Sequence, residues 1–393
     1  MYYRITAVDS WFFRDSAPYD AGVNTNGKSL FPPFPSVYAG ALRSCATPIS
    51  RSAGKNTFSR RLKIGWSGVI ADGHFLFPLP LDLSIHSTSN TRASEMRLGE
   101  AKGSSFPLKY FLEADKQEQD KGKPPHIYGG AFLENTSMDA YINAEDKRYP
   151  YQALGDYFTE ETRVGIRLDP SLGRAVEGQM YQQTFVYPRR EGRSCSLALE
   201  ATGIDVPQGS TVRLGGEGKL GVIECVSNAP KIPDAPVMNG EKYFKLYLAT
   251  PAIFEKGWLP GWIHTENMTG TFTHKKRRVR VKLVSAAVGN HVPVGGFGSV
   301  GIGQKSDGNY GQKPYPKELR YAVPGGSVYF FELLEGSMAD VIRLFHQKCI
   351  SDYRETLGFR YETRDRLRYC SRGFGYSLVG KVSKNQGGIL YVH

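Results

Sequence analysis

The chain has 393 residues, of which 40% are apolar and 12% aromatic, so it is long enough for two or three domains with real cores. Its net charge of +12 favours a polyanionic partner. The five cysteines form no CxxC pair, which argues against a disulfide framework or a zinc site. With no signal-peptide pattern and no apolar run near the ~20 residues needed to span a bilayer, we expect a cytoplasmic, soluble protein with no membrane partner.

The N-terminal segment predicts a strand, a loop and a short helix. Residues 3–13 read as a strand, and residues 18–35 are rich in Gly, Asn and Pro. Ser36 is in a position to cap a helix over residues 37–44, whose N-terminus would hold a phosphate through its free N–H groups. An ordinary packed helix explains the same pattern equally well.

The next stretch predicts a hairpin, an insertion and a second helix. Residues 62–70 and 74–81 flank the turn signal Asp72-Gly73. Residues 84–125 are polar with weak periodicity, and we interpret them as a partly mobile insertion. One short helix is expected within residues 131–153.

A long hairpin is predicted over residues 160–187. Residues 163–168 alternate between polar and apolar, residues 170–173 form a turn, and residues 179–187 alternate back. The arginines on or near it are Arg163, Arg167 and Arg174. A projecting basic hairpin suits a nucleic-acid backbone. A solvated edge ribbon whose charges prevent aggregation is an equally good interpretation.

Two Gly-x-Gly turns each stand beside cations and lead into an apolar strand. The first contains Gly216 and Gly218 with Lys219, and the second contains Gly373 and Gly375 after Arg372. Consecutive exposed N–H groups at such turns form an anion-binding concavity. Taken singly, each turn is more simply a tight entry into a strand. A third glycine-rich stretch, 294–305, is predicted to be a flexible loop that either contacts a ligand or is disordered.

The chain divides at a proline-rich stretch, since residues 228–236 contain three prolines. We expect domains at residues 1–227 and 241–393 joined by a linker at 228–240. The second half restarts with a strand at 243–250, and the densest basic run, 275–278, precedes another strand. Apolar residues at helical spacing predict a helix within 336–350. Each half therefore reads as an α+β unit, and two tandem ferredoxin-like units, similar to the RNA-recognition module, fit this order.

Several motifs, taken in order, resemble one family closely. They are Trp11-Phe-Phe-Arg-Asp15, Phe34-Pro-Ser-Val-Tyr-Ala-Gly-Ala-Leu-Arg-Ser44, Thr162-Arg-Val-Gly-Ile166, Leu214-Gly-Gly-Glu-Gly218, Thr250-Pro-Ala-Ile-Phe254, Gly257-Trp-Leu-Pro260, Val294-Gly-Gly296, Ala322-Val-Pro-Gly-Gly-Ser-Val-Tyr-Phe-Phe-Glu332 and Gly373-Phe-Gly375. The chain resembles the RAMP-type CRISPR-associated proteins, specifically the third subunit of the type III-B (Cmr) effector. This chain has Gly295-Gly-Phe297 where the family often has Gly-Gly-Trp, and residues 84–125 match nothing in it.

The resemblance implies a non-catalytic subunit that captures the 5′ repeat-derived handle of a guide RNA. It also implies a seat beside the large polymerase-like subunit and the backbone RAMP subunits, with target RNA contacted indirectly. We predict that phosphates meet cations and glycine amides, and that bases stack on phenylalanine. The predicted RNA contacts are Arg14, Ser36, Arg43, Ser44, Arg163, Arg167, Arg174, Gly215, Gly216, Gly218, Lys219, Lys256, Gly295, Gly296, Phe297, Lys305, Arg372, Gly373, Phe374 and Gly375.

The sequence offers little for catalysis. The eight histidines show no metal-ligand spacing, so neither a metal nor another cofactor is predicted. The alternative hypothesis is a guide-processing endoribonuclease that uses general acid–base chemistry, with His291 as the best candidate, although a solvated loop histidine explains that residue more simply. A third hypothesis is a scaffold that only bridges protein subunits.

Overall fold

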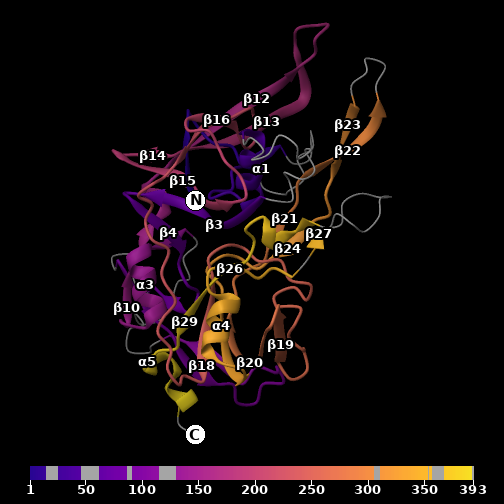
Figure 1. Cartoon of the computed structure of the whole chain (residues 1–393). Coiled ribbons are helices and arrows are strands. Elements are labelled where there is room, and N and C mark those ends of the chain that lie inside the picture. Colours follow the sequence, from indigo (N-terminus) through magenta and orange to yellow (C-terminus); the bar gives the residue numbers. More distant parts are fainter. Residues whose placement is uncertain are drawn as a thin grey trace.

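The computed structural model describes residues 1–14, 25–45, 62–85, 91–114, 130–304, 310–352, 354–355 and 367–391. Over these ranges the protein is strand-rich with few helices, which confirms the expected α+β class (Figure 1). The helices are α1 (Pro35–Cys45), α3 (Asn135–Asn143), α4 (Met338–Phe345) and α5 (Lys384–Gly387), with short 3-10 turns η2 (Leu154–Asp156), η3 (Tyr369–Ser371) and η4 (Gly388–Tyr391). None of the helices in these ranges has the length and apolar character to cross a membrane.

The first half of the chain builds a nine-stranded sheet. Along it lie, in order, β11 (Gln152–Ala153), β9 (Ala131–Glu134), β4 (His74–Pro78), β3 (Lys63–Ala71), β15 (Arg193–Thr202), β1 (Tyr2–Ala7), β17 (Leu220–Cys225) and β16 (Ser210–Arg213), while β14 (Arg189–Arg190) pairs with β15. The central order β17-β1-β15-β3 is antiparallel throughout. Because β1 and β3 are both antiparallel to β15, which lies between them, they run parallel to each other. Helix α1 lies in the connection from β1 to β3.

The second half builds a six-stranded sheet with the same central order. It contains β19 (Thr269–His274), β20 (Arg277–Ala287), β25 (Val328–Glu335), β18 (Tyr243–Leu248), β29 (Tyr376–Lys381) and β26 (Lys348–Cys349). The central order β29-β18-β25-β20 is again antiparallel. Here α4 connects β25 to β29. The two sheets therefore share one strand order, and each carries a helix at a different crossover.

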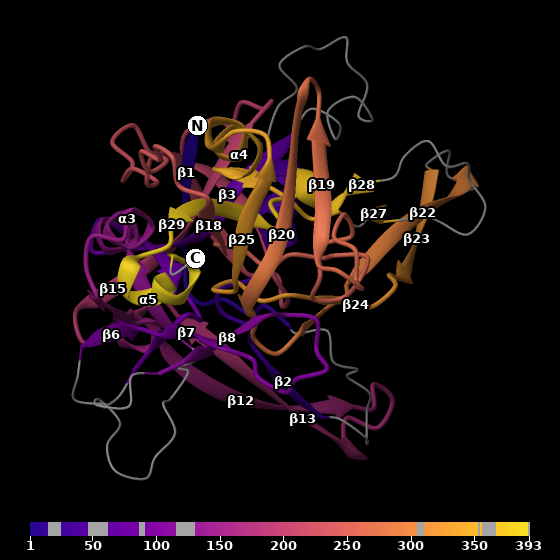
Figure 2. The same cartoon turned by 90° about the horizontal axis from the view of Figure 1, so that it is seen from below.

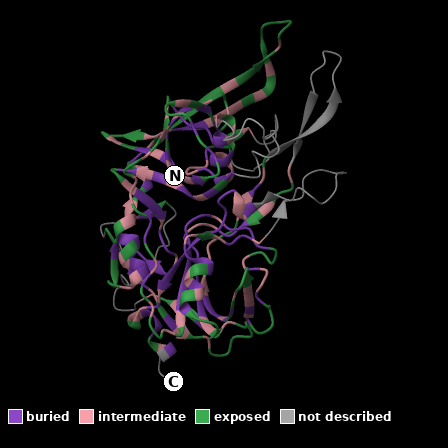
Figure 3. Cartoon of the chain, in the orientation of Figure 1, coloured by how far each residue is buried: buried purple, intermediate pink, exposed green. Residues whose placement is uncertain are grey.

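Helices and sheets alternate in layers. Helix α1 packs on one face of the first sheet, where Tyr38 and Leu42 meet Ile5 and Leu197. The other face of that sheet, α3 and one face of the second sheet share a single core, and α4 covers the remaining face of the second sheet. Figure 3 shows this buried interior continuing from one half of the chain into the other. The halves are thus joined by apolar packing as well as by the chain.

The proline-rich connection between the halves is fastened to the second sheet. The carbonyl of Pro233 accepts hydrogen bonds from Nε2 of His346 at 3.0 Å and Nε2 of Gln347 at 3.0 Å. Nδ1 of His346 accepts the backbone N–H of Val379 at 3.2 Å. Burial lowers the pKa of His346, so the neutral ring that makes both contacts is favoured.

Smaller sheets complete the molecule and bear on two predictions. Within the expected insertion at residues 84–125, the described residues form strands: β6 (Arg92–Glu95) pairs with β5 (Leu83–Ser84) and β10 (Arg148–Pro150), and β7 (Arg97–Glu100) pairs with β8 (Tyr110–Glu113). Buried apolar side chains hold these strands, including Ala93 and Leu98.

The glycine-rich stretch, predicted to be a loop, also forms a strand pair, because β22 (Phe297–Gln304) pairs with β23 (Tyr310–Pro316). The remaining pairs are β21 (Val292–Val294) with β24 (Arg320–Ala322) and β27 (Arg354–Glu355) with β28 (Leu367–Arg368).

The predictions of single turns and helices agree more closely with the structure. The hairpin of β3 and β4 is confirmed, with Asp72 at φ 49° and Gly73 at φ 80° in its turn. Helices α3 and α4 lie within the ranges expected for them. The predicted cap of α1 is wrong by two residues, because the helix begins at Pro35 and places Ser36 inside its first turn. Proline is favoured at a first helical position, since its missing N–H would be unpaired there.

Candidate nucleic-acid interface

The predicted long hairpin projects from one end of the molecule (Figure 1). It consists of β12 (Thr159–Leu168) and β13 (Ala175–Tyr187), with β2 (Asn26–Lys28) parallel to β13 at its base. At its turn, Oδ1 of Asp169 accepts the backbone N–H groups of Ser171 and Leu172. Figure 3 shows that the hairpin is mostly exposed. Because side chains alternate along a strand, the hairpin has two different faces.

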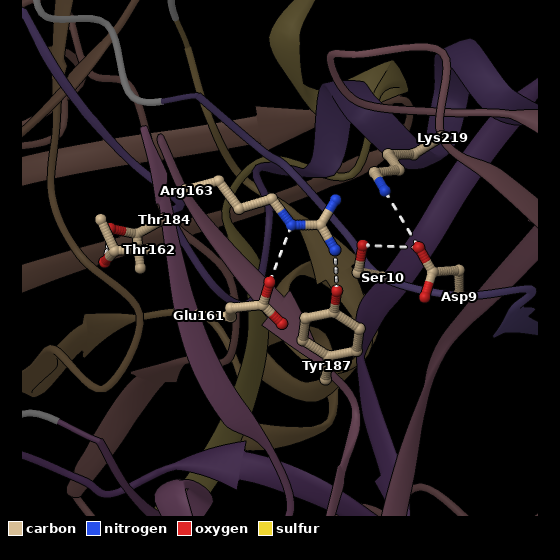
Figure 4. Close-up of polar contacts among 8 residues, drawn as sticks. All are labelled: Asp9, Ser10, Glu161, Thr162, Arg163, Thr184, Tyr187 and Lys219. Carbon is tan, nitrogen blue, oxygen red and sulfur yellow. Dashed lines mark hydrogen bonds and ion pairs between the residues drawn. The ribbon is translucent and has the colours of Figure 1, made fainter. Parts of the chain in front are cut away.

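One face carries arginine held in a fixed orientation. Nε of Arg163 donates to Oε1 of Glu161 at 2.8 Å, and a second guanidinium nitrogen donates to the hydroxyl of Tyr187 (Figure 4). The guanidinium carbon lies 4.8 Å from the centre of the Phe185 ring. Stacking and directed hydrogen bonds of this kind use the planar shape of arginine. The Arg163 side chain nevertheless stays 46% exposed.

The first Gly-x-Gly turn brings a second cation to the same ring. Nζ of Lys219 also lies 4.8 Å from the Phe185 ring centre, and it forms an ion pair with Oδ2 of Asp9 at 3.1 Å (Figure 4). These pairings lower the pKa of two carboxyl groups: the Arg163 hydrogen bond acts on Glu161, and the Lys219 hydrogen bond acts on Asp9. Two features that are separate in the sequence thus form one site.

A cavity of about 320 Å³ opens between the hairpin and the turn. Its lining includes Arg163, Tyr181, Gln183, Glu217 and Lys219. The amide of Gln183 donates to Oε1 of Glu217 at 3.0 Å, which ties the hairpin to the turn. The site therefore offers cations, an amide and a phenol within one recess, groups that suit contacts to sugar and phosphate.

The glycines of the first Gly-x-Gly turn have two different surroundings, one packed against Phe12 and the other open to solvent. Gly215 has φ 78°, and a Cβ there would lie 2.5 Å from the carbonyl oxygen of Phe12. The N–H of Gly216 donates to that same oxygen at 2.7 Å. Gly218, at φ 63°, is exposed with nothing near its missing side chain. The expectation that Gly216 offers its amide to a phosphate is therefore wrong in this conformation, because Phe12 already accepts that hydrogen bond.

The opposite face of the hairpin carries several exposed apolar side chains. The large apolar residues on its strands are 51–59% exposed: Val164, Ile166, Leu168 and Met180. Leu172, in the turn between the strands, is also exposed. Ile166 pairs with Met180 across the strands. Exposed apolar groups gathered on one surface commonly mark a protein contact.

The second Gly-x-Gly turn is buried, and this corrects its prediction. Arg372 is only 6% exposed and Phe374 is 0% exposed, so Phe374 cannot stack on a base in this conformation. The N–H of Gly373 donates to the carbonyl of Cys370, and the N–H of Gly375 donates to that of Pro251. A Cβ on Gly373 would lie 2.8 Å from a methyl carbon of Ile64, in the first sheet. This turn is where the two halves pack, and its amides are not available to an anion.

Most of the other predicted contacts lie apart from this site. Arg167 and Arg174 are exposed on the hairpin, where Arg167 donates to Oε1 of Gln179 at 3.1 Å. Arg14 is exposed and forms a bridge with Ser29 near the hairpin base. Ser36 and Arg43 sit at opposite ends of α1, and the hydroxyl of Ser44 donates to the carbonyl of Ala41.

In the second half, Nζ of Lys256 donates to the carbonyl of Ile263 at 2.6 Å, which closes a loop. Gly295 and Gly296 precede β22, and the carbonyl of Gly296 accepts the N–H of Lys317. Phe297 begins β22, and Lys305 lies outside the described residues. The ring of His291 stands edge-on to Tyr321 with centres 4.6 Å apart. The described part of the chain contains no group of three His, Cys, Asp or Glu side chains that could hold a metal ion.

The sequence analysis did not identify the aromatic rings of this site or the acidic side chains that pair with its cations. Phe185 and Tyr187 come from β13, while Asp9 follows β1. The alternation that predicted the hairpin does place Phe185 and Arg163 on one face. Nothing in the local sequence indicates that Lys219 and Asp9 approach them from the turn and from the end of β1.

Comparison with known proteins adds a family. The family model described as CRISPR-associated protein (Cas_Cmr3) matches residues 3–379 of this chain. Among solved structures, the chain is similar to one from a cryo-EM structure of the Type III-B Cmr-beta bound to cognate target RNA and AMPPnP, at 15% identity and TM-score 0.44, covering 84% of this chain and 86% of that one. A second, from the complex bound to cognate target RNA, gives 15% identity and TM-score 0.42, covering 87% and 89%. No curated protein sequence matches.

Proposed function

Because this chain belongs to the Cas_Cmr3 family of CRISPR-associated proteins, a subunit type of the type III-B Cmr effector complex, we propose that it holds the 5′ repeat-derived handle of the guide RNA. The observation that carries this proposal is the recess in which Arg163 and Lys219 flank the Phe185 ring. Two cations fixed at one ring give a strand's phosphates a preorganised contact. Arg167, Arg174 and Arg14 extend the positive surface along the hairpin and its base.

The fold proposed for this role is a pair of ferredoxin-like units. Two copies of the same antiparallel strand order, β17-β1-β15-β3 and β29-β18-β25-β20, support it. The crossover helix is α1 in the first unit and α4 in the second. We place the division at the proline-rich stretch, with domains 1–227 and 241–393, since each sheet draws its strands from one side of it.

The apolar face of the hairpin supports docking on another protein subunit of the complex, the large polymerase-like subunit or a backbone RAMP subunit. The two faces would then bind different partners, with RNA on the face of Arg163 and protein on the face of Ile166. In this assignment the chain positions RNA and performs no cleavage.

Binding of guide RNA to the purified full-length chain tests the proposal. We expect a guide RNA with its handle to bind more tightly than the same RNA without it, and the Arg163→Ala variant to lose that difference. Equal affinity for both RNAs would contradict handle recognition. Incubation with precursor RNA tests the endoribonuclease alternative: defined cleavage that disappears in His291→Ala would replace the proposal with that function.

A further inference from the structure

A second basic hairpin lies far from the first. Residues 269–287, which include β19 and β20, contain six Lys or Arg residues and no Asp or Glu. Figure 2 shows the β19–β20 turn and the β12–β13 hairpin on opposite sides of the molecule. A single short handle at the first hairpin does not account for this charge.

The strand register gives this hairpin an ordered outer face. Thr273, Thr271 and Thr269 of β19 lie opposite Arg278, Arg280 and Lys282 of β20. The intervening residues Val279 and Val281 are fully buried. The threonine hydroxyl groups therefore form one row and the cations form a parallel row. Successive cations are about 6.8 Å apart along the strand, which equals the rise of two nucleotides in a stacked nucleic-acid strand.

Part of this charge is not neutralised by the protein. Arg277 forms an ion pair with Asp340 at 2.6 Å, and Arg280 forms one with Glu335 at 2.9 Å. Lys275, Lys276 and Arg278 are exposed at and beside the turn, and none of the three forms an ion pair with a described residue. Concentrated, unpaired cations attract a polyanion.

The surface chemistry favours a nucleic-acid backbone over an acidic protein. Protein interfaces rely on buried apolar and aromatic anchors, and residues 269–287 carry no exposed large apolar side chain. Threonine hydroxyls and cations are the groups that contact phosphates. We propose that the outer face of β19–β20 binds the sugar–phosphate backbone of a nucleic-acid strand, separate from the handle site. The exposed cations of this face contact phosphates, which carry no base-sequence information, so we expect this contact to accept RNA and DNA alike.

The test uses the full-length chain and two labelled probes, oligouridine and oligothymidine of about 12 nucleotides. Affinity is measured against salt concentration for wild type and for the triple variant Lys275→Ala, Lys276→Ala, Arg278→Ala. We expect the log–log slope to flatten by about 2 for both probes, since each lost phosphate contact removes about 0.7. The matched control removes the same charge at exposed lysines elsewhere: Lys63→Ala, Lys147→Ala, Lys384→Ala. Lys275→Arg with Lys276→Arg should keep the wild-type slope.

Each alternative gives a distinct result. If the triple variant keeps the wild-type slope, the proposal is overturned, and the cations only protect the sheet edge formed by β19. If the triple variant keeps that slope but loses co-purification with other subunits, the surface binds an acidic protein instead. An equal loss in the control variant also overturns the proposal, because net charge would explain it. The handle experiment with Arg163→Ala is a separate measurement, so either proposal can fail alone.

Discussion

At the scale of single residues, Phe185 is the contact that organises the candidate site. Its ring receives Arg163 and Lys219 at 4.8 Å each, and the Phe12 ring at 5.2 Å. Cations near an aromatic ring gain electrostatic attraction. Glu161 and Asp9 pair with the two cations and reduce their mutual repulsion. The result is a fixed pair of positive groups beside an open recess.

The first prediction concerns the glycines of the first turn. We expect Gly215→Ala to destabilise the fold by about 2 kcal/mol or more, because the new methyl would meet the carbonyl oxygen of Phe12 in a left-handed backbone conformation. Gly218→Ala has a similar φ but open space around it, so its cost should be nearer 1 kcal/mol. Urea unfolding measures both, and equal costs would contradict the role of the Phe12 contact.

The second prediction concerns pH. His346 has a folded pKa below its ordinary value of 6.5 because it is buried. Its contribution to stability is therefore fully present above about pH 6.5, and it is lost as the pH falls toward the folded pKa, because the unfolded chain binds the proton first. We expect His346→Gln to show a flatter pH dependence of the unfolding free energy than wild type over this range. Identical profiles would exclude His346 as the titrating group.

Single residues also show why sequence could predict some features and not others. The turn at Asp72-Gly73 depends on neighbouring residues, and its prediction held. The two Gly-x-Gly turns look alike in sequence, yet Gly218 is exposed and Gly373 packs on Ile64 from the other half of the chain. Burial of that kind is decided by long-range packing, which local patterns do not contain.

At the scale of elements, the β12–β13 hairpin separates two chemistries by strand alternation. Arg163 and Arg167 lie on one face, and Val164, Ile166 and Leu168 lie on the other. The alternation of polar and apolar residues predicts the hairpin. Which other segments each face contacts depends on the tertiary fold, which the alternation does not contain. The glycine-rich hairpin of β22 and β23 was missed, because pairing of backbones needs no apolar pattern.

The third prediction separates the two faces. The double variant Ile166→Ser, Met180→Ser should change the stability of the isolated chain little, since both side chains are exposed. It should weaken assembly with co-expressed large and backbone subunits by about tenfold or more, while handle RNA affinity stays at the wild-type value. Arg163→Ala should do the reverse. Native mass spectrometry with RNA binding measures both, and a joint loss in either variant would contradict the division.

At the scale of the whole molecule, a buried polar network joins both halves and the C-terminal segment. Nζ of Lys245 lies 3.6 Å from Oδ2 of Asp82 and 3.5 Å from the centre of the Tyr141 ring. Gln386 donates to Asp82 at 2.7 Å. The hydroxyl of Ser383 donates to Glu95 at 2.6 Å, and burial raises the pKa of that carboxyl. Strand β6, β18 and the segment around α5 meet here, so the network holds β6 against both halves of the chain.

The fourth prediction tests this network. Lys245→Met should destabilise the protein by about 3–5 kcal/mol, because it leaves a buried carboxylate without its cation. Adding Asp82→Asn should recover a large part of the loss, since the remaining amide carries no charge. Thermal unfolding and urea unfolding measure both variants. A single variant as stable as wild type would show that the buried ion pair does not hold the halves together.

The most direct measurement of the central claim is a salt titration of handle RNA affinity for the full-length chain. Wild type is compared with Arg163→Ala, Lys219→Ala and the charge-matched control Lys63→Ala. We predict that each site variant weakens binding and flattens the log–log slope by about 0.7, while the control keeps the wild-type slope. If both site variants fold normally and retain the affinity and slope of wild type, the handle is not held between the hairpin and the first glycine turn.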